Sequence, residues 1–317
     1  MTKFVIGLAL AVWCCFSIAA PNIITVTIGY APGSGNEISF RGVAAQIEKA
    51  DPNIHFVIIN RPGADEVVAL NAFTKLPPTG DQLFVVTQQG FTTSEKWYAG
   101  QIQYNPMDLV LVTTLSKSPL AIIANHNSQI SSPAEFIKLL QLPQRNVNIG
   151  YSAAAHRLTF EYIMDQTNGN RQWVKGIQYK GSAQTAIDVA SGQVEFGIVP
   201  SSVAYSLYKS GKIKYIALTG NKKIKQLQSV PLLEHYVPGS DILGAWVVAL
   251  PPGSTPAQVK FYQQLFTKAI NDPTTQEYFE NNLMFSVPDE QTHSGVTAHI
   301  KSLRKKWIPY VNTLTAE

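Results

Sequence analysis

Short apolar runs alternate with amphipathic stretches along most of the chain, and this alternation predicts an α/β fold. The expected strands are rich in valine and isoleucine and almost continuously apolar, which is typical of strands covered on both faces. They are Ile23–Ile28, Phe56–Asn60, Leu83–Thr87, Val110–Leu115, Leu120–Ala124, Val147–Tyr151, Phe196–Val199, Tyr215–Thr219 and Trp246–Leu250.

Helix starts are marked between these runs by polar cap residues followed by proline. Residues 132–135 read Ser-Pro-Ala-Glu, the pattern of a capping box with proline at the first helical position. Thr255-Pro256 and Asp272-Pro273 repeat the signal, and residues 292–312 predict an amphipathic C-terminal helix. No repeat or long polar linker separates two halves, so two lobes would be connected by more than one crossing of the chain.

The first twenty residues form a segment of their own. Lys3 precedes an apolar run from Phe4 to Ile18, and small residues follow at the end of the run. This pattern predicts a signal peptide over residues 1–20, cleaved after Ala19 or Ala20, and therefore a periplasmic protein. A membrane anchor or a buried helix is the alternative, but the run is short for a bilayer span. Both cysteines of the chain lie inside the segment.

Composition and charge exclude several classes of protein. The chain has 317 residues, which is enough for two domains, and a formal net charge of +4 spread along its length. No stripe of basic and aromatic residues is present, so no nucleic-acid partner is expected. The six histidines lack the spacing of metal ligands, and the second strand does not end in the acidic residue of a dinucleotide site. We expect neither a metal nor a cofactor.

Two turns between a strand and a helix are candidates for chemistry. Residues 30–37, Tyr-Ala-Pro-Gly-Ser-Gly-Asn-Glu, could direct backbone N–H groups and a helix N-terminus at a carboxylate or phosphate. An ordinary structural turn explains the same residues equally well. The second turn, residues 150–154, reads Gly-Tyr-Ser-Ala-Ala and resembles a nucleophile elbow that lacks its last glycine.

The second turn gives an enzyme hypothesis. Ser152 would be the nucleophile of a serine hydrolase, with Asp188 or Asp241 and one of His235, His293 and His299 completing a triad. No oxyanion segment accompanies it, and small residues also let a backbone turn approach a ligand closely. We therefore favour a binding turn and expect no enzyme activity.

These motifs, in order, resemble a known family. Ala31–Glu37 is followed by Asn60-Arg61-Pro62-Gly63-Ala64, Tyr104-Asn105-Pro106, Tyr179–Ala183, Ser191–Val194, Ser210–Ile213, Val230-Pro231 and Pro252–Pro256. In the order of these motifs, the chain is similar to the substrate-binding receptors of tripartite tricarboxylate transporters, the Bug or TctC-type family. The resemblance covers nearly the whole chain after the signal segment.

The resemblance implies a type II periplasmic-binding-protein fold, a Venus flytrap of two lobes joined by two crossing strands. Residues 21–120 and 245–317 would form the first lobe, and residues 121–244 the second. It also implies a small carboxylate ligand held by loop amides, and membrane permease subunits as partners of a monomeric receptor. A sensor or interaction protein with the same fold is the remaining alternative.

The chain departs from the family pattern in its loops. Ser34, Asn36 and Glu37 replace glycines and a Thr-Asp pair, and the second turn is shortened to small residues. Arg157 stands where a histidine is common, and Val199 where an acidic residue is common. The expected ligand contacts are Tyr30, Pro32, Gly33, Ser34, Gly35, Asn36, Thr87, Ser152, Ala153, Ala154, Ala155, Arg157, Val199 and Ser201.

Overall fold

The computed structural model describes residues 23–314. The predicted signal peptide, residues 1–20, lies outside the described residues. The strands are β1 (Ile23–Ile28), β2 (His55–Asn60), β3 (Gln82–Thr87), β4 (Val110–Asn125), β5 (Val147–Tyr151), β6 (Val174–Gln178), β7 (Phe196–Pro200), β8 (Ile213–Leu218) and β9 (Leu243–Leu250). The helices are α1 (Gly35–Ala50), α2 (Val67–Phe73), α3 (Ser94–Trp97), α4 (Pro133–Gln141), α5 (Ala154–Gln166), α6 (Ser182–Ser191), α7 (Ser201–Lys209), α8 (Pro256–Ile270), α9 (Pro273–Asn281) and α10 (His293–Thr313). Short 3-10 helices include η1 (Gln88–Phe91), which follows β3, and η5 (Pro288–Glu290), which precedes α10.

The alternation of strands and helices confirms the predicted α/β class. The cap signals are also confirmed, because Ser132 and Thr255 each form a capping box and Asp272 accepts from the backbone N–H of Thr274. Strand β6 was not predicted. Its sequence, Val-Lys-Gly-Ile-Gln, is neither continuously apolar nor alternating, and it forms the edge of the sheet beside β5.

The prediction of two strands at 110–115 and 120–124 was wrong, because β4 is one strand across both. Lys117 and Pro119 interrupt the apolar pattern without ending the strand. The first part of β4 pairs with β9 as far as Pro119, which lies opposite Leu243. From Leu120 onward, β4 pairs instead with β7 and β8. Strand β4 therefore crosses from one sheet to the other.

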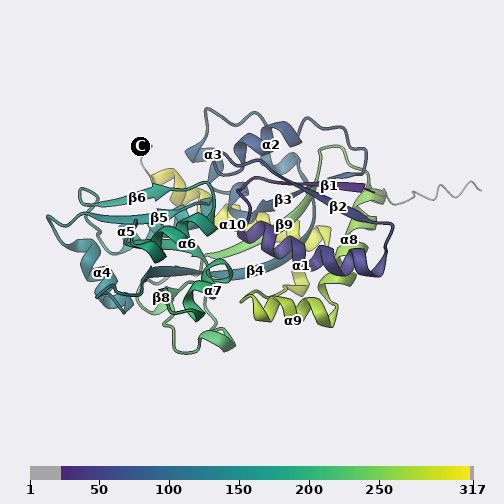
Figure 1. The fold of residues 1–317 in the computed structure, drawn as a ribbon. Coiled ribbons are helices and arrows are strands. Elements are labelled where there is room, and N and C mark those ends of the chain that lie inside the picture. The colour runs from purple at the N-terminus through teal and green to yellow at the C-terminus, as the bar shows by residue number, and fades with distance from the viewer. Residues whose placement is uncertain (1–22, 315–317) are drawn as a thin grey trace, which may run out of the picture.

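The two sheets define two lobes (Figure 1). In the first lobe, β1 lies between parallel neighbours β2 and β3, and β9 joins β3 to β4 in antiparallel fashion. In the second lobe, β5 lies between parallel neighbours β6 and β7, and the end of β4 pairs antiparallel with β7 and β8. The carboxyl ends of the parallel strands β1 and β5 both lead directly into helices that start where the two lobes meet.

Each sheet buries side chains on both faces, as the apolar strands require. In the first lobe, Phe40 of α1 and Phe266 of α8 pack on one face, and Phe73 of α2 packs on Phe84 on the other. The second lobe has separate clusters on its two faces in the same way. Each lobe therefore has a hydrophobic core on both faces of its sheet.

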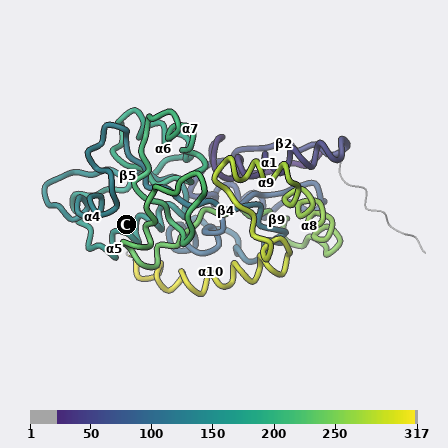
Figure 2. The backbone as a smooth tube through the Cα atoms, turned by 90° about the horizontal axis from the view of Figure 1, so that it is seen from below, coloured from purple at the N-terminus to yellow at the C-terminus, as the bar shows by residue number. Residues whose placement is uncertain are grey.

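Helix α10 runs along one side of the molecule past both lobes (Figure 2). Its first half buries Val296 and Ile300 in the first lobe's core, and its second half buries Trp307 and Val311 in the core of the second. The C-terminal helix is therefore a third link between the lobes, beside β4 and β9. Within residues 23–314, no helix is long and apolar enough to cross a membrane.

Candidate ligand-binding site

The N-termini of four helices meet between the two lobes. Helix α1 follows β1 in the first lobe, and α5, α6 and α7 follow β5, β6 and β7 in the second. Within the described chain, none of these four helices has a side-chain hydrogen bond at its N-cap. Their first N–H groups therefore keep the partial positive charge of a helix N-terminus, which favours an anion.

A small enclosed cavity lies at this meeting point. It is lined by Tyr30, Ser34, Gly35, Asn36, Thr87, Gln89, Ala153, Ala155, His156, Ser182, Pro200, Gly244, Ala245 and Trp246. No lysine or arginine is among these described lining residues, so the helix ends are the source of positive potential there. The cavity measures about 10 Å³, which is room for about one water molecule.

Contacts between the lobes close the cavity. The backbone N–H of Ala31 donates to the Lys180 carbonyl across the gap at 3.2 Å. Gln178 Nε2 in the second lobe donates to the Tyr98 hydroxyl in the first at 2.8 Å. The structure thus shows the lobes in a closed arrangement.

Half of the predicted ligand contacts line the cavity. They are Tyr30, Ser34, Gly35, Asn36, Thr87, Ala153 and Ala155. The other predicted residues do not line it, namely Pro32, Gly33, Ser152, Ala154, Arg157, Val199 and Ser201. The two predicted turns nevertheless face each other across the cavity.

Local contacts explain why several predicted residues point elsewhere. The guanidinium of Arg157 lies over the Trp97 ring, 4.5 Å from its centroid. Val199 is buried in the core of the second lobe, and the Ser201 hydroxyl pairs with that of Ser118 at 3.0 Å. The backbone N–H of Gly33 donates to the carboxylate of Glu37 at 3.1 Å. These groups are held by the fold itself.

Sequence reasoning missed the contacts that depend on helix phase or on distant segments. His156, not Arg157, lines the cavity, because residues 153 and 156 share one face of the helix start. Gln89, Ser182, Pro200, Gly244, Ala245 and Trp246 also line it without having been predicted as contacts. Counting helical positions from Ala153 could have identified His156, whereas no sequence pattern indicated Gln89.

Trp246 limits the size of the cavity. Its indole is buried and lies directly against Gly35: a Cβ atom added at Gly35 would be 2.2 Å from Cζ2 of the ring. The absence of a side chain at residue 35 therefore lets the first turn and the crossing strand β9 approach each other. We attribute the narrow site to this contact.

The proposed serine-hydrolase triad is not assembled. Ser152 Oγ lies 3.3 Å from Nδ1 of His156, four residues along the chain, and 3.2 Å from the Ser182 hydroxyl. Burial lowers the pKa of His156 to about 3, so its imidazole is neutral and is a poor general base at neutral pH. Asp188 instead pairs with Tyr179 and Gln184, and Asp241 with Lys306.

Of the histidines named for that triad, two have other partners. His293 contacts the Leu111 carbonyl, and His299 belongs to a polar network at the crossing strands. Among residues 23–314, no group of three or more histidine, cysteine, aspartate or glutamate side chains is placed to hold a metal ion.

Glu66 lies behind the first turn and uses two of the predicted ligand donors. Its carboxyl oxygens accept hydrogen bonds from the Thr87 hydroxyl at 2.7 Å, the Thr87 N–H at 3.1 Å and Asn36 Nδ2 at 3.2 Å. Asn36 Nδ2 also donates to the Val85 carbonyl at 2.9 Å, so both of its amide hydrogens are used. Asn36 and Thr87 are thus positioned by Glu66, which leaves the Asn36 backbone N–H as that residue's group for a ligand.

The segment that carries Glu66 is acidic and buried. Ala64, Asp65 and Glu66 all have positive φ, at 46°, 47° and 75°, a conformation that costs free energy for residues other than glycine. Burial raises the pKa of Glu66 to about 8 and the pKa of Asp65 to about 6. In the folded chain Glu66 therefore keeps its proton at neutral pH, and Asp65 keeps its proton to a higher pH than a free aspartate does.

The stabilisation that Glu66 contributes to the folded chain should be lost as the pH rises from about 5 to about 8. In the folded chain Glu66 keeps its proton up to about pH 8, whereas in the unfolded chain it loses the proton near pH 4.5. The stabilisation is complete at pH values below the pKa of Glu66 in the unfolded chain. It is lost as the pH rises through the pKa of Glu66 in the folded chain. We expect the free energy of unfolding of the wild type, measured by urea unfolding, to fall by on the order of 2–4 kcal/mol relative to that of Glu66→Gln over this range. Asp65 and His156 also have shifted pKa values, but they contribute to the slope of both proteins.

Glu135→Gln is the matched control for this prediction. Hydrogen bonds from Ser131 and Ser132 lower the pKa of Glu135, so this exposed carboxylate is ionised throughout the range. The variant should keep the wild-type slope. A full slope in Glu66→Gln would contradict the assignment of the titrating group to Glu66.

Comparison with known proteins decides the family. The profile described as tripartite tricarboxylate transporter family receptor matches residues 40–312. The chain belongs to this family. A UPF0065 protein from Cupriavidus necator is 24% identical over 260 residues, which cover 80% of this chain and 76% of the relative.

Solved structures show the same fold. The R. palustris protein Rpa4515 with adipate superposes with a TM-score of 0.86 at 19% identity, covering 94% of this chain and 99% of that one. The periplasmic binding protein BugD gives 0.84 at 17% identity, covering 92% and 97%. The predicted periplasmic-binding-protein fold is therefore confirmed.

Membership in the family also settles the class of activity. This receptor is a solute-binding protein of a tripartite tricarboxylate transporter and not an enzyme. Receptors of the family work in the periplasm and bind small carboxylates for the membrane components of the transporter. The contact between Ser152 and His156 is therefore not part of a catalytic triad.

Proposed function

We propose that this receptor binds one small organic carboxylate between the turns 34–36 and 153–155. The observation that supports this most strongly is the meeting of four uncapped helix N-termini at one cavity with no cationic side chain among its described lining residues. Four partial positive charges favour a carboxylate there. The likeness to the adipate-bound protein Rpa4515 supports the same class of ligand.

The backbone N–H groups of Ser34, Gly35 and Asn36 would bind the carboxylate from the first lobe. Ala153 at the N-cap of α5, and the two residues after it, would bind it from the second lobe. The Ser34 hydroxyl is buried and has no hydrogen-bond partner among residues 23–314, so it is available to the same group. Ser182 and Tyr30 complete the wall around the carboxylate.

Binding requires the lobes to separate first. A cavity of about 10 Å³ is far below the roughly 300 Å³ or more of typical ligand pockets. Hinge motion of two lobes around a ligand is the usual solution in binding proteins of this shape. We propose lobes made of residues 21–120 with 245–317 and of residues 121–244, after removal of the signal peptide 1–20. The receptor would act as a monomer and present its ligand to permease subunits.

A thermal-shift experiment tests this function. Residues 21–317 are heated with each member of a panel of organic acids, among them adipate, and with the uncharged diamide adipamide as the matched control. Because a ligand that binds only the folded state stabilises it, an acid at 100 times its Kd should add about 2.7 kcal/mol and raise Tm by about 5 °C or more. No shift with any acid, or an equal shift with the diamide, would contradict the proposal.

A further inference from the structure

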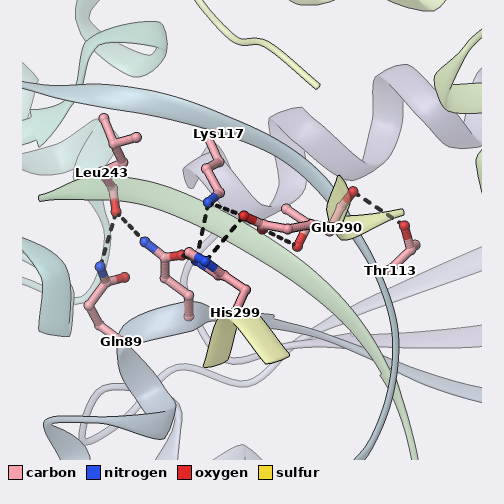
Figure 3. A network of polar contacts seen from close by, with 8 residues as sticks. Gln89, Thr113, Lys117, Leu243, Glu290 and His299 are labelled. Carbon is pink, nitrogen blue, oxygen red and sulfur yellow. Dashed lines mark hydrogen bonds and ion pairs between the residues drawn. The ribbon is translucent and has the colours of Figure 1, made fainter. Parts of the chain in front are cut away.

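Gln89 lines the cavity and has a buried hydrogen-bond acceptor without a partner in the described part of the chain. The residue lies in η1, directly after β3, and only 2% of its surface is exposed. Its Nε2 donates to the Leu243 carbonyl at 3.1 Å (Figure 3). Its Oε1 is buried without a hydrogen-bond partner in the described part of the chain. Since Gln89 also lines the cavity, this oxygen is available to a ligand.

The orientation of the Gln89 amide is fixed by its surroundings. The Leu243 carbonyl only accepts, so the amide nitrogen must face it, and a flipped amide would place two oxygens together. Gln88 Nε2 donates to the same carbonyl at 3.0 Å, and its own Oε1 lies 2.9 Å from Nε2 of His299. Within residues 23–314, Gln89 is therefore the one of these two glutamines whose acceptor oxygen has no polar contact.

The carbonyl that holds Gln89 belongs to the crossing strands. Leu243 begins β9 opposite Pro119, where β4 changes from one sheet to the other. The network continues from His299 to Lys117 Nζ at 3.1 Å and to Glu290 Oε1 at 3.2 Å (Figure 3). The acceptor in the cavity is therefore held by the part of the structure about which the lobes would move.

We propose that Gln89 Oε1 accepts a hydrogen bond from a hydroxyl group of the bound acid, so that the site selects hydroxy acids over acids that lack the hydroxyl. This inference rests on the carboxylate-binding function proposed above. An amide oxygen accepts and cannot donate, so it requires a donor on the ligand. An ammonium group is a donor too, but four helix N-termini around the cavity oppose a positive charge. A hydroxyl satisfies the oxygen without that cost.

The expected discrimination follows from the cost of an unpaired buried acceptor. An acid without the hydroxyl would fill the closed site and leave Oε1 without a partner, whereas a hydroxy acid pairs it. We expect the hydroxy acid to bind at least about 10-fold more tightly than the matched acid.

Isothermal titration of matched acids tests the inference. The probes are succinate with both enantiomers of malate, and glutarate with 2-hydroxyglutarate and 3-hydroxyglutarate; aspartate tests the amine. In the wild-type receptor, at least one hydroxy acid should show the 10-fold preference, and aspartate should not. Gln89→Met removes the acceptor and should reduce the preference to within about twofold.

Gln88→Met is the matched control. It removes the same kind of bond to the Leu243 carbonyl, but Gln88 does not line the cavity, so the preference for the hydroxyl should persist. Equal binding of hydroxy and plain acids by the wild type, or a preference that survives in Gln89→Met, would overturn the inference and leave the receptor function intact. If no acid binds in the thermal-shift experiment or in the titration, the proposed carboxylate-binding function itself is contradicted.

Discussion

Replacing Lys117 by methionine is expected to lower the free energy of unfolding by about 3–5 kcal/mol. Lys117 Nζ and Glu290 Oε1 form an ion pair at 2.6 Å, and each side chain is only 8% exposed. Glu290 also accepts from the Thr114 hydroxyl at 2.9 Å. Removal of one partner leaves a buried charge without compensation, which is far more costly than the loss of the pair as a whole. Urea unfolding of the variant measures the change.

A double-mutant cycle separates the interaction free energy between Lys117 and Glu290 from the effects of the two single substitutions. Glu290→Met should cost about as much as Lys117→Met, and the double variant should be more stable than the sum predicts, by about 2 kcal/mol or more. The Lys225–Glu280 pair is the matched control, because its side chains are 84% and 51% exposed. Deleting either member of that pair should change stability by less than about 1 kcal/mol. Equally small effects at Lys117 and Glu290 would contradict the account of this network.

Gly35→Ala is expected to weaken acid binding by about 100-fold. A Cβ at residue 35 would meet Cζ2 of the Trp246 indole at 2.2 Å, and this ring is buried and cannot move freely. The first turn must then shift, and the loss of about two hydrogen bonds to the carboxylate, at about 1.5 kcal/mol each, corresponds to a loss of about 100-fold. Titration with the acid that binds the wild-type receptor most tightly measures the loss.

A second substitution should restore binding. Trp246→Phe removes the part of the indole that meets the new methyl group, so the pair Gly35→Ala with Trp246→Phe should recover most of the affinity. Gly100→Ala is the control, because nothing lies within 4 Å of a Cβ at that exposed turn, and it should bind like the wild type. Unchanged affinity in Gly35→Ala would show that the first turn does not hold the ligand.

The fold could be predicted where burial dictates the residue types. In strands such as Ile23–Ile28 and Val147–Tyr151 the buried positions carry mainly valine and isoleucine, and the predicted bounds agree with the structure. Strand β6 lies at an edge, where partial exposure permits lysine, glycine and glutamine, and the pattern disappears. Strand β4 was divided in the prediction because its crossing segment carries Lys117, whose charge is compensated by a residue that lies 173 positions away.

Of the site, only the two backbone turns could be predicted from the sequence. Small residues after β1 and β5 indicated two turns able to approach a ligand, and the structure places these turns on opposite sides of one cavity. Side-chain roles depended on long-range contacts that no local pattern contains. Gln89 is held by Leu243, 154 residues away, and the Asn36 side chain is directed to Glu66, 30 residues away.

The crystal structure of the receptor with its tightest-binding acid tests the central claim most directly. We predict that the carboxylate lies between the lobes, with its oxygens within about 3.2 Å of backbone N–H groups from both turns, 34–36 and 153–155. A carboxylate bound to one turn alone would contradict this account. So would an acid in the roughly 740 Å³ groove that Lys222, Lys223 and Phe285 help to line.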